Sequence, residues 1–217
     1  MNYKHFKLKY SNNIAWVHFD YSYGSMNVLS GEVLTELKDV LLEVKSDNPD
    51  GMVICSDKST GFIAGADVTE FKDFHEYDDA YEAITKGQEV MWLIDDMEFP
   101  TLALINGLCL GGGLELALSC DYRIILDSPN IRVGFPEVKL GIHPGFGGSV
   151  RSIRVLGVIK AMGMMLSGRT LSVYQAKKMG LVDYAVPERL LVKSAEDVLA
   201  KCPPVRRPDK LDSVLNS

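Results

Sequence analysis

The stretch GLCLGGGLELALSC, residues 107–120, places three consecutive glycines just before a single acid in an otherwise uncharged run. It follows PTLALIN (100–106), a short apolar run that predicts a buried strand. A strand, a glycine turn and a helix beginning near Gly113 would present unpaired backbone N–H groups at the positive end of the helix. The missing Cβ atoms would let a ligand oxygen approach those groups closely. The stretch therefore predicts an anion or oxyanion site, with tight helix packing as the alternative role of the glycines.

The acid in this stretch is Glu115, which falls in the first turn of the predicted helix. Its neighbours, residues 114 and 116–118, are all apolar, so we expect a helix buried nearly all round. Burial raises the pKa of a carboxyl group toward the range useful for proton transfer. A second acid, Glu137, lies in RVGFPEVKLGIHPGFGG (132–148). The residues alone favour a solvent-exposed loop position for this second carboxyl group.

Predicted strands alternate with predicted helices along the rest of the chain. The strands are expected at residues 14–19, 51–56, 100–106, 122–126 and 131–135. Helices are expected in part of the charged segment up to about 96 and at about 146–156, 158–166, 172–179 and 187–201. A further helix, capped by Ser30, is expected from the helical spacing of Val33, Leu34, Leu37, Val40, Leu41 and Val44. GFIAGAD (61–67) is expected to be a loop, and the alternation predicts an α/β fold with largely parallel sheets.

Composition narrows the classes of function. The formal net charge of −6 disfavours nucleic acid as a partner. The cysteines form no CxxC pair and have no histidine at ligand spacing, so we expect buried thiols of a reducing compartment and no metal site; they are Cys55, Cys109, Cys120 and Cys202. The first residues lack the apolar region of a signal peptide and no uncharged run is long enough to span a bilayer. We therefore expect a cytoplasmic protein.

Three common motifs do not fit the glycine-rich segments. A dinucleotide-binding GxGxxG would need glycine where Cys109 stands, and a phosphate-binding GxxxxGK[ST] loop would need a lysine after the glycines. Around Ser149, the nucleophile motif GxSxG would need a glycine where Arg151 stands. Cradling of nucleotide phosphates and serine hydrolysis are therefore disfavoured.

Four ordered motifs between residues 10 and 200 resemble the crotonase (enoyl-CoA hydratase/isomerase) superfamily. The motifs are GFIAGADVTEF (61–71), PTLALINGLCLGGGLELALSCDYRI (100–124), VGFPEVKLGIHPGFGGSVR (133–151) and SGRTLSVYQAKKMGLVDYAV (167–186). Within that superfamily MNVLS (26–30), CDYRI and GIHPGFGGSVR are most similar to the hydratase domain of bifunctional fatty-acid β-oxidation proteins. The resemblance implies a crotonase-like α/β spiral of ββα units with C-terminal helices, here truncated.

The resemblance also implies a site for the hydration of 2-trans-enoyl-CoA to 3-hydroxyacyl-CoA. It assigns the oxyanion hole to the backbone N–H groups of Ala66 and Gly112, and the catalytic acids to Glu115 and Glu137. The substrate would also meet, largely through backbone atoms, the residues Ile63, Ala64, Gly65, Gly111 and Pro136. Coenzyme A enters as part of the substrate, and neither a metal nor a redox cofactor is implied.

Two other enzyme activities remain open on the same fold, double-bond isomerisation and thioester hydrolysis, as does an inactive scaffold that binds protein or RNA. Retention of both acids favours the hydratase. The turn ILDSPNIR (125–132) makes the spacing between the acids about two residues longer than the resemblance implies, which a surface turn should tolerate.

Residues 1–200 are expected to form the hydratase domain. The proline-rich residues 201–217 are expected to be a linker-like tail that leads to a missing dehydrogenase part. The resemblance further implies a trimer-based homo-oligomer, no membrane span and, in the full-length protein, a thiolase subunit as partner.

Overall fold

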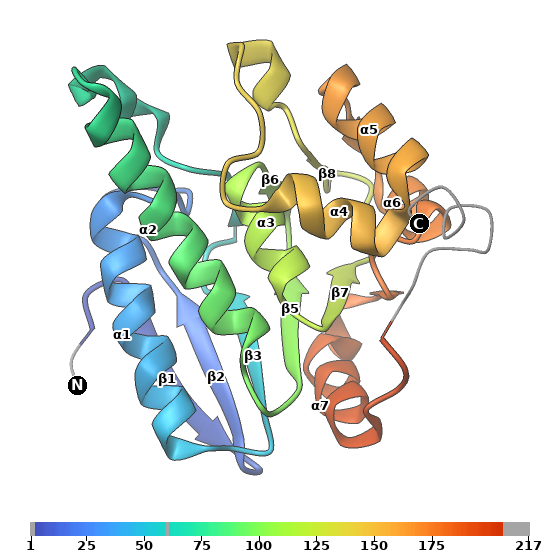
Figure 1. The fold of residues 1–217 in the computed structure, drawn as a ribbon. Coiled ribbons are helices and arrows are strands. Elements are labelled where there is room, and N and C mark those ends of the chain that lie inside the picture. The colour runs from blue at the N-terminus through green and yellow to red at the C-terminus, as the bar shows by residue number, and fades with distance from the viewer. Residues whose placement is uncertain (1–2, 60, 206–217) are drawn as a thin grey trace.

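The computed structural model in Figure 1 describes residues 3–59 and 61–205. A larger sheet forms the centre of the molecule, with its strands in the order β1-β2-β3-β5-β7-β10. These strands are β1 (Phe6–Ser11), β2 (Ile14–Phe19), β3 (Gly51–Ser56), β5 (Thr101–Ile105), β7 (Tyr122–Leu126) and β10 (Tyr184–Val186). β1 and β2 form an antiparallel hairpin, and every other neighbouring pair is parallel. The expectation of a largely parallel sheet is confirmed.

A smaller sheet of short strands lies beside the larger one, in the order β4-β6-β8-β9. Its strands are β4 (Gly61–Ile63), β6 (Leu108–Leu110), β8 (Val133–Gly134) and β9 (Thr170–Leu171). A strand of the larger sheet, a strand of the smaller sheet and a helix follow one another three times along the chain, as β3-β4-α2, β5-β6-α3 and β7-β8-α4. This repeat is the spiral of ββα units that the resemblance implied.

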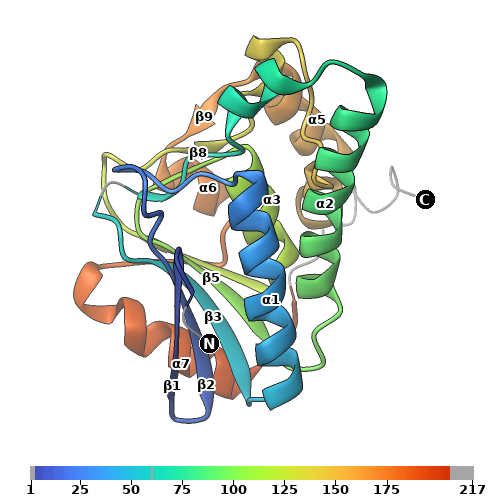
Figure 2. The same cartoon turned by 90° about the vertical axis from the view of Figure 1, so that its left-hand side faces the viewer.

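Helices cover both faces of the larger sheet. The helices that the structure describes are α1 (Gly31–Asp47), α2 (Tyr77–Asp95), α3 (Gly112–Ser119), α4 (Gly148–Leu156), α5 (Val158–Ser167), α6 (Val173–Met179) and α7 (Leu191–Lys201). In the described part of the chain, 3₁₀ turns precede α2, α4 and α7; they are η1 (Val68–Asp73), η2 (Glu137–Leu140) and η3 (Glu188–Leu190). Figure 2 shows α1 and α2 on one side of the sheet and α7 on the other. Each side has its own cluster of buried apolar side chains.

Local sequence signals position two of these helices as expected. The Ser30 side chain accepts a hydrogen bond from the Val33 amide at 3.2 Å and so caps α1. The buried residues of α1 are the six apolar residues of the predicted stripe. In α6, Ser172 and Gln175 form the expected capping box, in which each side chain accepts from the other's backbone N–H.

The structure corrects several local expectations. Residues 61–63, expected within a loop, form β4, and the strand at 100–106 does not run directly into the glycines because β6 intervenes. The strand expected at 131–135 is reduced to Val133–Gly134, and β1, β9 and β10 were not predicted. Except for β1, which has six residues, these strands have only two or three residues and are too short to carry an alternating pattern, so tertiary pairing defines them.

The expectation for the four cysteines is partly wrong. All four are free thiols, and three are buried, but Cys202 is exposed. It ends α7 in a left-handed conformation at the C-cap, a position at the surface where its amide satisfies the Val198 carbonyl. Within the part of the chain that the structure describes, no helix combines the length and apolar character needed to cross a membrane. Of the expected tail, residues 206–217 lie outside the described residues.

The different burial of two leucines on α1 predicts that their substitution will change the free energy of unfolding by different amounts. Leu37 is fully buried, whereas Leu42 is 45% exposed. Leu37→Ala should lower the free energy of unfolding by about 2–5 kcal/mol, because it removes transfer energy and leaves a cavity. Leu42→Ala should change it by less than about 0.5 kcal/mol. Urea unfolding followed by circular dichroism measures both, and equal losses would contradict the assigned core face.

Candidate active site

The glycine turn at the start of α3 is shaped for exposed backbone donors. Gly111 caps α3 with φ 49° and ψ −125°, a conformation open to glycine because it has no Cβ. The Gly111 amide donates to the Gly134 carbonyl of β8 at 3.0 Å, which fixes the turn against the smaller sheet. The Gly111 carbonyl accepts from Leu114 and Glu115, while the N–H of Gly112 belongs to the first turn and has no intrahelical partner.

The loop after β4 lies directly against this turn. The Leu29 amide donates a hydrogen bond to the Gly65 carbonyl, and the Asp67 amide donates one to the Leu29 carbonyl. These two bonds form a parallel bridge on either side of Ala66. The Ala66 N–H therefore points away from Leu29. A Cβ atom at Gly112 would lie 3.3 Å from the Ala66 nitrogen. The two amides assigned to the oxyanion hole are thus brought side by side, and among the described residues no backbone acceptor takes either N–H.

Asn27 secures the loop, a role that was not predicted from its local sequence. Its buried side-chain amide donates to the carbonyls of Phe19 and Phe62, at 3.2 and 3.0 Å, and so ties the end of β2 to β4. Its backbone carbonyl accepts from the Ala64 amide at 2.8 Å. The residue lies in the MNVLS stretch, where a single amide precedes two apolar residues, which is only a weak signal.

Glu115 lies in the first turn of α3, and every residue of that helix is buried, as expected. The side chain is 2% exposed, and its Oε1 accepts a hydrogen bond from the Gly148 amide at 2.7 Å. Burial raises the pKa of Glu115 to about 7, and the charge of Glu137 contributes to the rise. The amides of Gly148 and Phe146 and the charge of Arg151 act in the opposite direction.

Glu137, for which the residues alone favoured solvent exposure, is buried at the start of η2 with 9% of its surface exposed. Burial raises its pKa, and the charge of His143 opposes the rise. A Cβ atom at Gly111 would lie 3.0 Å from Oε1, so this carboxyl group lies against the glycine turn. Its Oε2 is buried and has no hydrogen-bond partner among the described residues, which leaves it available to a ligand.

The remaining predicted site residues surround the same junction. Ile63 is packed so closely on α3 that a Cβ atom at Gly113 would lie 2.4 Å from its carbonyl oxygen. Gly65 lies against Leu110: a Cβ atom at Gly65 would lie 3.5 Å from the Leu110 carbonyl oxygen. Ala64 lines a shallow hollow with Asn27 and other residues of β4. Pro136 is the residue before η2 and is half-buried.

Two residues of the segment before α4 complete the site, and the role of one of them, Gly148, was not predicted from the sequence. Gly148 supplies the amide that holds Glu115. Phe146 fills the space between α2 and α3, where Cβ atoms at Gly87 and Gly112 would lie 2.3 and 3.2 Å from its ring. The local signal for Gly148 was the doubled glycine in GFGGSVR (145–151), beside a serine whose neighbours do not fit GxSxG.

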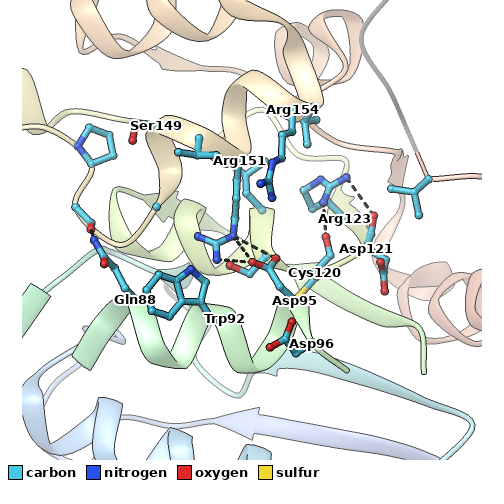
Figure 3. Close-up of a pocket in the computed structure, with 18 of the residues that line it drawn as sticks. Gln88, Trp92, Asp95, Asp96, Cys120, Asp121, Arg123, Ser149, Arg151 and Arg154 are labelled. Carbon is cyan, nitrogen blue, oxygen red and sulfur yellow. Dashed lines mark hydrogen bonds and ion pairs between the residues drawn. The ribbon is translucent and has the colours of Figure 1, made fainter. Parts of the chain in front are cut away.

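A cavity in the described part of the molecule lies away from these residues. It has a volume of about 870 Å³ and lies between α2, the end of α3 and α4, as Figure 3 shows. Among the residues that the structure describes, its lining includes Asp95, Arg123 and Arg151 but none of the predicted site residues. The predicted site residues lie instead at the β4–α3 junction. Among the described residues, this junction combines two backbone N–H groups that have no backbone acceptor with two buried carboxyl groups, and such groups can stabilise an oxyanion and transfer protons.

Comparisons with known proteins agree with this fold. A family model described as Enoyl-CoA hydratase/isomerase matches residues 9–204. Curated relatives named fatty acid oxidation complex subunit alpha include one from Shewanella loihica, 43% identical over 94% of this chain and 29% of its own, and one from Vibrio campbellii, 41% identical over 89% and 28%. The chain spans less than a third of the length of these relatives.

A solved structure points to the same fold. The crystal structure of an enoyl-CoA hydratase from Bacillus anthracis matches with a TM-score of 0.83 and 30% identity. The match covers 91% of this chain and 76% of the hydratase. The crotonase-like architecture expected from the sequence motifs is thereby confirmed.

The electrostatic effect of Glu137 on Glu115 predicts a coupled titration. Glu137→Gln should lower the pKa of Glu115 below about 7, because it removes a negative charge that raises that pKa. A ¹³C NMR titration of the Glu115 carboxyl group, assigned with Glu115→Gln, measures the change. Glu188→Gln removes the same charge from the exposed turn η3 and should leave the titration unchanged. An unchanged Glu115 pKa in Glu137→Gln would show that the two carboxyl groups do not interact.

Proposed function

The chain belongs to the enoyl-CoA hydratase/isomerase family, and from this premise we propose that it hydrates 2-trans-enoyl-CoA thioesters to 3-hydroxyacyl-CoA. One observation carries the proposal: Glu115 and Glu137 are both buried at the junction that also presents the Ala66 and Gly112 amides. Relatives named fatty acid oxidation complex subunit alpha support a place for this reaction in fatty-acid β-oxidation.

The amides of Ala66 and Gly112 act on the thioester oxygen. In a 2-enoyl-CoA the C2=C3 bond is conjugated with the thioester carbonyl, so addition at C3 moves negative charge onto that oxygen. Two N–H donors at the positive end of α3 stabilise the resulting enolate. Loss of one donor of this kind typically costs about 3 kcal/mol of transition-state stabilisation.

The two carboxyl groups act on water. One carboxylate accepts a proton from the water molecule as the water oxygen bonds to C3. The other carboxyl group, which is protonated, delivers a proton to C2 as the enolate collapses. The sum is the addition of one water molecule across the double bond. Because burial and mutual repulsion raise the pKa of Glu115 to about 7, the pair can hold the one proton that this exchange needs near neutral pH.

The remaining site residues position the thioester. We assign backbone contacts with the CoA side of the substrate to Ile63, Ala64 and Gly65, and contacts near the reacting carbons to Gly111 and Pro136. Addition of water changes no oxidation state overall, and the carboxyl groups supply the proton transfers. We therefore propose that the reaction uses neither a redox cofactor nor a metal ion.

The assembly in which the site works is also a proposal. The relatives that this chain resembles are named as subunits of a complex and are more than three times as long. We propose that residues 1–200 correspond to their hydratase part, with a dehydrogenase part beyond it, a thiolase subunit as partner and trimer-based association of this fold. A cytoplasmic location accords with acyl-CoA as the substrate.

Double-bond isomerisation is the alternative reaction for this site. It moves a proton from one carbon of the acyl chain to another, and a single carboxyl group can shuttle it. The buried position and free Oε2 of Glu137 favour hydration, which uses the second carboxyl group to hold water.

Removal of either acid tests the hydration mechanism. Glu137→Gln should lower the rate of crotonyl-CoA hydration at least about 100-fold with KM little changed, because it removes a proton-transfer group and leaves the shape of the site intact. Glu115→Gln should do the same, and the exposed Glu188→Gln should retain full activity. The measurement follows the loss of ultraviolet absorbance of the conjugated thioester. Near-normal turnover in Glu137→Gln would refute the paired assignment.

A further inference from the structure

We propose that Arg151, held by Asp95, is a positioning residue that fixes the Glu115 carboxyl group by clamping the turn before α4. The inference rests on the proposed function and adds a residue that does not itself meet the substrate. Three consecutive contacts connect Asp95 and Arg151, in the wall of the large cavity, with Glu115.

The first contact joins α4 to the end of α2. Arg151 is 5% exposed, and its Nε donates to Asp95 Oδ1 and Oδ2 at 3.2 and 3.0 Å. Its Nη2 also donates to Oδ2, at 2.5 Å. Figure 3 shows this pair bridging the two helices at the cavity wall. A planar guanidinium held by several such bonds has a fixed orientation, which a lysine ammonium could not reproduce.

The second contact joins the guanidinium to the turn. Nη1 donates to the Phe146 carbonyl at 3.0 Å. Gly147 adopts φ 102°, and a Cβ atom there would lie 2.1 Å from Nη1. The guanidinium thus lies directly on the turn, at a point where only glycine leaves room for it. The Arg151 amide also donates to the Gly147 carbonyl at 3.0 Å.

The third contact joins the turn to the acid. The Gly148 amide donates to Glu115 Oε1 at 2.7 Å, and a Cβ atom at Gly148 would lie 2.6 Å from Glu115 Cγ. A shift of the turn therefore moves both the amide and the packing surface of the carboxyl group. Displacement of a catalytic group by about 1 Å can cost 100-fold in rate.

The charges around Glu115 agree with this geometry. The positive charge of Arg151 lowers the pKa of Glu115, and the negative charge of Glu137, from η2, raises it. His143 acts on Glu137, and Asp95, from α2, is paired with Arg151. Loss of the guanidinium should therefore raise the Glu115 pKa as well as loosen its carboxyl group.

Arg154 provides a matched control. It lies one turn further along α4 and lines the same cavity, but its side chain is exposed and contacts neither the turn nor Glu115. Substitution of Arg154 changes the net charge of the protein and of the cavity by the same amount as substitution of Arg151. It tests whether any effect comes from the clamp or from the charge of the cavity.

The experiment compares Arg151→Gln, Arg151→Lys and Arg154→Gln with the wild type. We expect Arg151→Gln to lower kcat for crotonyl-CoA by about tenfold or more with KM within about threefold, since a positioning loss acts on the transition state. The same variant should raise the Glu115 pKa in a ¹³C NMR titration. Arg151→Lys should keep that pKa close to the wild-type value yet still lower kcat. Arg154→Gln should match the wild type in both measurements.

Three results would overturn the proposal. They are a folded Arg151→Gln with wild-type kcat and Glu115 titration, a rise in KM alone, or a kcat loss no greater than the fraction of protein that is unfolded. If Arg151→Gln does not fold, wild-type kcat in Arg151→Lys overturns it instead. A wild type without hydratase activity would refute the proposed function, while the Glu115 titration would still decide the role of Arg151.

Discussion

The close approach of two backbone segments determines the architecture of the site. The loop after β4 meets the glycine turn before α3 so tightly that Cβ atoms at Gly112 and Gly113 would lie 3.3 Å from the Ala66 nitrogen and 2.4 Å from the Ile63 carbonyl oxygen. The contact at Gly113 leaves no room for a side chain, and the contact at Gly112 leaves very little. The ββα spiral supplies this contact, since β4 and β6 pair in parallel in the smaller sheet and deliver both segments to one edge.

Opposing electrostatic effects then set the properties of the acids. Burial of Glu115 disfavours its charged form, and the nearby Glu137 adds to that effect. The amides before α4 and the Arg151 charge partly offset it, which brings the pKa to about 7. A wholly apolar surrounding would keep the carboxyl group protonated, and a solvent-exposed one would keep it ionised. Proton exchange near neutral pH needs the intermediate case.

Local patterns in the sequence predicted those features of the fold that depend on residues close together along the chain. The apolar stripe of α1 and its Ser30 cap, and the burial of Glu115 among apolar residues, were of this kind. The short strands β4 and β6 were not, since three residues carry no period. The Asp95–Arg151 pair joins residues 56 positions apart, and neither residue shows locally that it has a partner. The residues around Glu137 favoured exposure, and only the motif resemblance pointed to a catalytic role for it.

A crystal structure of the protein with a bound enoyl-CoA or an unreactive analogue tests the central claim most directly. The claim predicts the thioester oxygen within about 2.7–3.1 Å of both the Ala66 and Gly112 nitrogens. It also predicts that the carboxyl groups of Glu115 and Glu137 share one water molecule beside C3. A thioester bound instead in the cavity between α2 and α4, or amides directed away from its oxygen, would contradict the claim.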